Sequence, residues 1–262
     1  MRIPLWQVDA FTDRVFAGNP AAVCPLEAWL PDATLLAIAS ENNLAETAFL
    51  VREGDGWAIR WFTPALEVDL CGHATLASAH VVFRHLEPGR STVTFRSQSG
   101  PLAVARRDGG LLAMTFPRRP GRSAPVPDAV ARAVGRAPEE ALLSRDWMAV
   151  LRTEDEVRSL RPDLDAVATL PGHGIIVTAP ATTPGIDFVS RYFAPQAGIP
   201  EDPVTGSAHC TLVPYWAARL GKARLEALQV SRRGGRLSLE DRADAVEIAG
   251  RTAEYLSGTI EV

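Results

Sequence analysis

The sequence lacks the features that mark several specialised classes of protein. It has only three cysteines, Cys24, Cys71 and Cys210, and no C-x-x-C pair, so neither a disulfide framework nor a cysteine zinc site is expected. No run of about 18 apolar residues occurs, and the first residues contain no long apolar segment, which favours the reducing cytoplasm. The net charge of −4 argues against binding to nucleic acid or to an anionic membrane, because both need a basic face.

Common catalytic and metal-binding motifs are also missing. There is no G-x-S-x-G elbow, Walker A loop or G-x-G-x-x-G fingerprint, so hydrolase, nucleotide and dinucleotide functions have no support. The histidines show no H-x-H or H-E-x-x-H spacing, and a histidine metal site is therefore not expected at His73, His80, His85, His173 or His209. The sequence predicts chemistry that needs neither a metal nor a cofactor.

What the sequence does contain is a partial internal repeat. The segment RWFTP at Arg60–Pro64 returns as RYFAP at Arg191–Pro195, 131 residues later, which is half of the 262-residue chain. With 47% hydrophobic and 22% charged residues there is ample material for a core. Repetition at half the chain length predicts two similar halves rather than one large domain.

Each copy of the repeat is followed by a glycine that leads into a helix-like run. Gly72 lies in EVDLCGHAT at Glu67–Thr75, and Gly206 lies in EDPVTGSAH at Glu201–His209. A glycine allows a tight turn, and the first N–H groups of a helix are left without partners at the positive end of its dipole. Such a corner attracts a carboxylate or a phosphate.

The runs after these glycines contain no charged residue. Residues 74–83 and 207–218 lack Asp, Glu, Lys and Arg, and a helix that is uncharged on every face is a buried one. We therefore expect each half to wrap a sheet around one central helix. Pro214 is expected to bend or divide the second helix.

The halves are expected at residues 1–117 and 128–251. Residues 118–127 are proline-rich and are the best candidate for a linker. A strand near 252–262 is a candidate for completing the N-terminal half.

Glu46 is the first candidate for chemistry. Its neighbours in residues 44–49 carry no other charge, so a raised pKa and a general acid/base role are expected, against the alternative of a surface glutamate. His73 lies at the first corner, where it could donate to a substrate oxygen or assist proton movement. Asp202, at the second corner, is another acid or else an N-cap. Cys71 is either a thiolate activated by the helix or a buried structural residue.

These candidates suit a small anionic molecule in a cleft between the halves. Backbone N–H groups from both corners can hold a carboxylate and stabilise the enolate-like charge that forms when an adjacent carbon loses its proton. Such a site needs a base and no cofactor.

Four separated motifs resemble the phenazine-biosynthesis PhzF-like family along the length of the chain: FAGNPAAV at 16–23, AETAF at 45–49, LCGHAT at 70–75 and EDPVTGSA at 201–208. The resemblance implies an α+β fold of the diaminopimelate epimerase type. In that fold two pseudo-symmetric halves each wrap a sheet around a central helix, with the active site in the cleft between them. It also implies a cofactor-independent isomerase that is commonly a homodimer.

The resemblance assigns roles to individual residues. In the family's best-known member a glutamate moves a proton between carbons of dihydro-3-hydroxyanthranilate, and that glutamate corresponds to Glu46. His73 and Asp202 are implied as further catalytic residues. Substrate contacts fall on Gly72, Gly206 and Ser207. The phenazine enzyme has a serine where this chain has Ala45, so one hydroxyl is missing from the pocket. The resemblance therefore implies the reaction class more firmly than that particular substrate.

Two alternatives stay open. A two-thiol racemase or epimerase of the same fold needs a cysteine at each corner. Cys71 could be the first, but the second corner has none, and Cys210 lies a turn inside the helix. The other alternative is a binding protein that kept the cleft and lost the chemistry.

Overall fold

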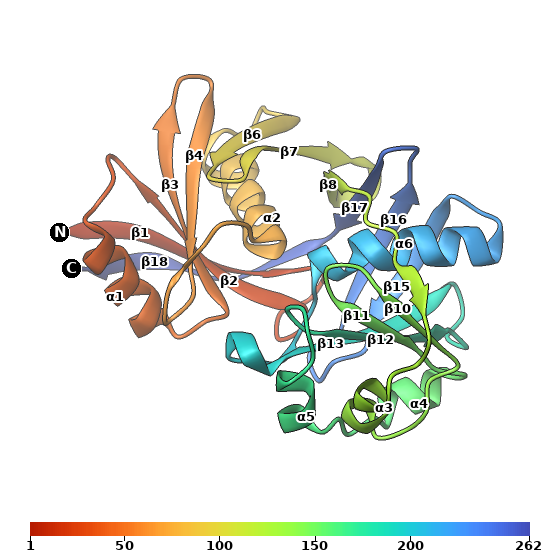
Figure 1. Ribbon diagram of the computed structural model, residues 1–262. Helices are drawn as coiled ribbons and strands as arrows, with labels where there is room; N and C mark the ends of the chain where they lie inside the picture. Colours follow the sequence, from red (N-terminus) through yellow and green to blue (C-terminus); the bar gives the residue numbers. More distant parts are fainter. The chain divides into compact units, whose positions relative to one another are not determined.

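The computed structural model describes all residues, 1–262, as two compact units. Unit 1 comprises Met1–Thr115 together with Ala249–Val262, and unit 2 comprises Phe116–Ile248. In Figure 1 the colours from red to yellow and the last blue strand belong to unit 1, and green to blue belongs to unit 2. None of the helices combines the length and the apolar composition that a membrane-spanning helix needs.

Unit 1 is built on a mixed sheet. Its strands are β1 (Arg2–Ala10), β2 (Asn19–Leu26), β3 (Glu46–Glu53), β4 (Gly56–Phe62), β5 (Glu67–Val68), β6 (Thr92–Ser97), β7 (Gly100–Arg107), β8 (Leu111–Pro117) and β18 (Thr252–Glu261). The pairing order is β18-β1-β2-β3-β4-β6-β7-β8, with β5 beside β4; β2–β3 and β4–β6 are parallel and the other pairs antiparallel. Because β1 and β18 run side by side, the two termini meet in Figure 1.

The helices of unit 1 are α1 (Asp32–Asn42), α2 (Gly72–Val81), the π-helical turn η1 (Val82–Leu86) and the 3₁₀ turn η2 (Asp108–Gly110). Helix α2 is the central one. It packs against β1, β2, β3 and β18, and eight of its ten residues are buried. Its buried hydroxyls bond within the helix: Ser78 Oγ donates to the carbonyl of Ala74 at 2.7 Å. The expected buried helix inside a sheet is confirmed for this unit.

Unit 2 repeats this plan with more helices. Its strands are β9 (Arg122–Ala124), β10 (Glu140–Leu143), β11 (Trp147–Val150), β12 (Ile175–Pro180), β13 (Phe188–Ala194), β14 (Ile199–Asp202), β15 (Arg224–Gln229), β16 (Gly235–Asp241) and β17 (Ala245–Gly250). The pairing order is β9-β10-β11-β12-β13-β15-β16, with β14 beside β13; β11–β12 and β13–β15 are parallel.

The sheet of unit 2 is covered on both faces. The short helices α3 (Asp128–Val134), α4 (Glu154–Arg158) and α5 (Leu164–Ala168) share an apolar cluster with Val177 and Ala179 of β12. Thr178 points to the other face, where its Oγ1 accepts a hydrogen bond from Trp216 Nε1 of α6 (Gly206–Leu220) at 3.0 Å. Figure 1 shows α6 and these short helices on opposite sides of β10–β13.

Two segments of unit 2 differ from the expected local structure. Pro214 lies inside α6, but the helix runs on to Leu220 as one element, so the expected division does not occur. The proline-rich residues 118–127 include strand β9, which pairs with β10. Arg118 of this segment also forms a two-point ion pair with Asp241 at 2.8 and 3.1 Å.

The internal repeat has a structural counterpart in each unit. Arg60 on β4 binds both carboxylate oxygens of Glu67 on β5, at 2.7 and 2.6 Å. Arg191 on β13 binds Glu201 on β14 in the same way, at 2.6 and 3.0 Å. Each guanidinium also lies over the phenylalanine ring two residues further along its strand, at 5.1 and 4.9 Å. We call this two-point ion pair between arginine and glutamate an arginine fork. One such fork anchors the short strand that leads into each corner.

Candidate functional site

Glu46 is the first residue of β3, at the point where the loop after α1 enters the sheet. Its sequence neighbours are apolar or uncharged, and its side chain is buried like those of the next four residues of the strand. The residue is only 8% exposed. The alternative of a surface glutamate is therefore wrong, and a buried carboxylate must find a partner to remain ionised.

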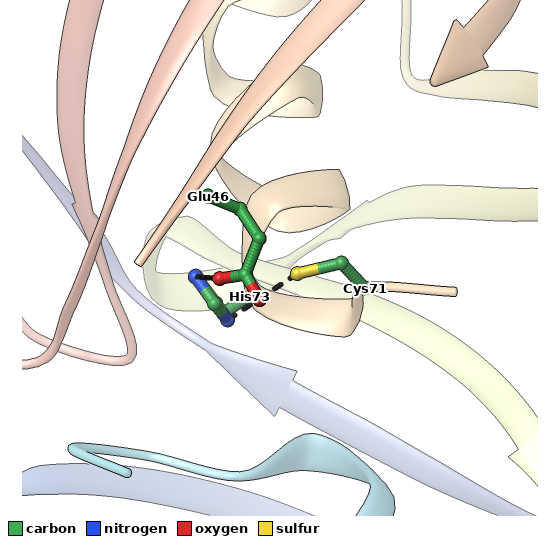
Figure 2. A group of neighbouring side chains, drawn as sticks. All are labelled: Glu46, Cys71 and His73. Atoms are coloured by element: carbon green, nitrogen blue, oxygen red, sulfur yellow. Dashed lines mark hydrogen bonds and ion pairs between the residues drawn. The ribbon is translucent and has the colours of Figure 1, made fainter. Parts of the chain in front are cut away.

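That partner is His73, the second residue of α2, which is 6% exposed. Its Nε2 lies 3.0 Å from Oε2 of Glu46, and Figure 2 shows the two side chains meeting from β3 and from the first turn of α2. On the other side of the ring, Nδ1 lies 3.1 Å from the amide nitrogen of Asn19. Because that nitrogen can only donate, Nδ1 of the neutral ring accepts and Nε2 carries the hydrogen that faces Glu46.

The charge of His73 follows from its neighbours. Burial disfavours the imidazolium, but Cys71 and Glu46 outweigh it, and the pKa of His73 lies above its ordinary value. For Cys71, burial and the nearby Glu46 charge raise the pKa of the thiol, so it stays neutral near pH 7. A neutral thiol cannot hold an imidazolium, and we therefore attribute the effect to the carboxylate of Glu46. The two side chains are in direct contact, with Nε2 of His73 at 3.0 Å from Oε2 of Glu46.

Cys71 completes the group in Figure 2. It occupies the N-cap position of α2, and its Sγ lies 3.5 Å from Nδ1 of His73. Of the two hypotheses for Cys71, its raised pKa favours the buried structural thiol over the activated thiolate. Donor atoms of Glu46, Cys71 and His73 lie within 4.8 Å of one another, a set that a metal ion could use. Binding would require ionising a thiol that burial keeps neutral, so the set fits proton transfer better.

The corners differ from the expected geometry. Neither Gly72 nor Gly206 has a positive φ, and a Cβ at Gly206 would meet no heavy atom within 4 Å. The expectation that glycine is needed at these corners to allow a tight turn is therefore wrong. Both α2 and α6 begin without a side-chain cap and without an acid in the first turn. Their first N–H groups are thus left for an anion.

In unit 2 the predicted residues gather at the start of α6. Oδ2 of Asp202 accepts a 2.5 Å hydrogen bond from the hydroxyl of Thr205, which is the N-cap residue. The alternative that Asp202 caps α6 is therefore wrong. Gln229 fixes the turn, because its Oε1 accepts from the Thr205 N–H at 2.8 Å and its Nε2 donates to the Asp202 carbonyl at 2.8 Å.

Ser207 has a neighbour that the sequence did not reveal. Its Oγ accepts a hydrogen bond from Arg145 at 3.2 Å, and Arg145 also contacts the buried carboxylate of Asp146 at 3.3 Å. A guanidinium beside a helix N-terminus adds a second group that attracts anions. No sequence signal pointed to Arg145 or to Gln229. Asn19, in contrast, lies in the motif FAGNPAAV and could have been found there.

The structure thus places Glu46, Gly72 and His73 together in unit 1. It places Asp202, Gly206 and Ser207 together at the start of α6 in unit 2.

Comparison with known proteins agrees with this arrangement. The sequence profile of the family described as phenazine biosynthesis-like protein matches residues 8–258. An "uncharacterized isomerase" of Pseudomonas aeruginosa is 50% identical, with both chains covered completely. The crystal structure of a PhzF family protein from Enterococcus faecalis superposes with a TM-score of 0.97 at 46% identity, again over all of both chains.

The fold extends further than the family. A hydroxyproline epimerase from Agrobacterium vitis, solved with bound trans-4-hydroxy-L-proline, has a TM-score of 0.60 at 11% identity. The match covers 99% of this chain and 92% of that one. At this level of identity the likeness concerns the fold, which is the two-unit epimerase type expected from the sequence.

Proposed function

The chain belongs to the phenazine biosynthesis-like (PhzF) family of isomerases, and we propose that it moves a proton between carbon atoms of a small carboxylic acid with Glu46 as the acid/base. The observation that carries this proposal is the buried contact between Glu46 and His73. Proton transfer at carbon needs a positioned base whose strength is not reduced by hydration. A buried carboxylate in contact with one imidazole meets that need.

The reaction follows from the geometry of unit 1. Oε2 of Glu46 lies against Nε2 of His73, and the second carboxylate oxygen takes a proton from the carbon next to the substrate's acid group. The negative charge that develops on the substrate is stabilised by N–H groups at the start of α2. The protonated Glu46, whose proton exchanges with solvent on some turnovers, then delivers a proton to a different carbon, so the product is an isomer with the same composition as the substrate.

The charges around the two corners indicate the class of substrate. Uncapped helix N-termini at Gly72 and Gly206 favour an anion, and Arg145 adds a cation beside Ser207. We assign Asp202 to the catalytic set, since its carboxylate is fixed by Thr205 and can bond an amino or hydroxyl group of a cyclic substrate. Ala45 lacks the hydroxyl of the phenazine enzyme, so we expect a related acid rather than dihydro-3-hydroxyanthranilate.

The test is isotope exchange. Small cyclic amino and hydroxy acids are screened for thermal stabilisation of the protein, and ligands that bind are incubated with it in D₂O and followed by NMR. We expect wild type and Cys71→Ser to introduce deuterium into the ligand. Glu46→Gln should bind the ligand but introduce no deuterium into it. A two-thiol racemase would instead lose exchange in Cys71→Ser, and a binding protein would show no exchange in any of the three.

The two-thiol alternative has little support in the described residues. Burial raises the pKa of Cys210 to about 11, and the residue lies at the fifth position of α6. Neither Cys71 nor Cys210 is therefore a thiolate near neutral pH.

A further inference from the structure

A second group of ionisable side chains lies at the far end of α2 from His73. His80, His85 and Glu254 converge there, and we call them the His–His–Glu cluster. Oε2 of Glu254 lies 3.3 Å from Nε2 of His80 and 2.6 Å from Nε2 of His85. The three donor atoms lie within 4.8 Å of one another. Seven residues of helix separate His80 from His73, about 10 Å along the axis, so the cluster is distinct from the Glu46 site.

The two histidines meet because the helix changes its winding. Residues five apart point about 140° away from each other on an α-helix. After Val81, however, the chain continues as the π-helical turn η1, closed by a hydrogen bond from the N–H of Glu87 to the carbonyl of Val82. The wider turn brings His80 and His85 to the same side. Such single π turns are rare and are frequently found at functional sites.

The strand that supplies Glu254 is irregular at the same place. Gln7 of β1 pairs with Leu256 of β18, but Val8 pairs with Glu254, so Tyr255 is the extra residue of a β-bulge. A bulge redirects the neighbouring side chains. Two independent departures from regular backbone therefore meet at the His–His–Glu cluster.

The surroundings prepare the cluster to bind a cation. Nδ1 of His80 lies 2.8 Å from the Thr252 hydroxyl, which can accept an N–H from the ring once a bound cation takes the lone pair of Nε2. A neutral imidazole and an ionised carboxylate are the forms that ligate metals.

We propose that the His–His–Glu cluster binds a divalent transition-metal ion such as Zn²⁺, with Nε2 of His80, Nε2 of His85 and Oε2 of Glu254 as ligands. Two imidazoles and a carboxylate are a set that zinc takes at about 2.0–2.2 Å, with water as the fourth ligand. A tetrahedron of that size separates its ligand atoms by roughly 3.3 Å, so His80–Glu254 is already at that spacing and His85 moves outwards slightly.

The approaches to the site allow this. The side chain of His85 is 28% exposed, which gives an ion access from solvent. Arg84 Nε lies 3.9 Å from Glu254, but its side chain is 64% exposed and can turn away to make room for the ion. The bound metal would join the end of α2 to β18, and it would add to the stability of unit 1 without taking part in proton transfer.

The test is titration of the full-length, chelator-treated protein with Zn²⁺ in a calorimeter. We expect one site in wild type, and a loss of affinity of at least about tenfold in both His85→Gln and Glu254→Gln. His173→Gln, which changes an exposed histidine outside the cluster, and Cys71→Ser, which removes the other possible donor set, should bind like wild type. Circular dichroism establishes that each variant is folded.

Trp6 provides a second readout. Its ring lies 5.2 Å from that of His85, so Co²⁺ or Ni²⁺ at the cluster should quench its fluorescence, and Trp6→Phe should remove that part of the quenching. Absence of zinc binding in wild type would overturn the proposal. So would binding that survives both His85→Gln and Glu254→Gln, or that only Cys71→Ser abolishes.

Discussion

Nε2 of His73 lies 3.0 Å from Oε2 of Glu46, with both residues less than one-tenth exposed. Water screens a pair at this depth very little, so the charge of Glu46 acts strongly on the His73 ring. The same contact governs the proposed chemistry and part of the stability. It can therefore be tested without a substrate.

We expect the stability contributed by His73 to be lost as the pH rises. Burial opposes a charged ring, but its neighbours Cys71 and above all Glu46 raise the pKa of His73 above its ordinary value of 6.5. A raised folded-state pKa adds stability that is complete below the unfolded-state pKa and disappears as the pH passes the folded-state value. Urea unfolding from about pH 6 to 9 should show wild type losing stability relative to His73→Gln. In a Glu46→Gln background the difference should be much smaller; an unchanged slope would contradict the pairing.

His209 should give the opposite dependence. It is fully buried in α6, and burial lowers its pKa to about 4, against a bond from its ring to the carbonyl of Thr205. A lowered histidine pKa contributes stability above about pH 6.5 that is lost as the pH falls towards 4. The loss should reach about 3 kcal/mol. Acid unfolding of His209→Asn should lack this component, whereas the exposed His173→Asn should retain it.

The two arginine forks offer a matched pair of variants. Arg191 is 8% exposed, and besides Glu201 it binds two backbone carbonyls in and just after α4. Arg191→Met leaves these acceptors and a partly buried carboxylate without a donor, and we expect a cost of about 3 kcal/mol. Arg60→Met removes the equivalent fork at a wetter position, so about 1 kcal/mol is expected. Denaturant unfolding measures both; equal losses would argue against burial as the cause.

Gly206→Ala separates folding from ligand binding. Gly206 is a helical residue with a φ that any amino acid adopts and open space around its Cβ position. Alanine should therefore be neutral or stabilising by up to about 1 kcal/mol. Its methyl group would crowd an anion that approaches the first N–H groups of α6, and we expect weaker ligand affinity. Thermal unfolding with and without ligand measures both effects. Unchanged affinity would remove Gly206 from the proposed substrate contacts.

The uncharged run after Gly72 shows what sequence can predict well. A helix with no charge has only one stable location, so burial of α2 and the sheet around it follow from composition alone. Glu46 and His73 were found in the same way, because each lies in a short motif whose neighbours are apolar.

Other features could not be found from the sequence because they depend on distant parts of the chain. Gln229 fixes Asp202 and Thr205 across more than twenty residues, and no local pattern marks it. His80 and His85 have a spacing that indicates nothing on an ordinary helix, and only the π turn of η1 brings them together. The prediction of a tight turn at Gly206 was wrong for a different reason. Glycine occurs both in tight turns and where a ligand approaches the backbone closely, and the sequence alone does not distinguish the two.

The pairing of β1 with β18 has a consequence for biosynthesis. Strand β1 is translated well before its partner β18, so its register from Arg2↔Glu261 to Ala10↔Thr252 is completed only after the whole of unit 2 has been translated. Until then one edge of its nascent sheet has exposed amides, the kind of surface that chaperones protect. Unit 2 is one uninterrupted stretch of chain and can fold while the chain is being translated. The usual order of folding, in which the N-terminal part folds first, is therefore reversed in this protein.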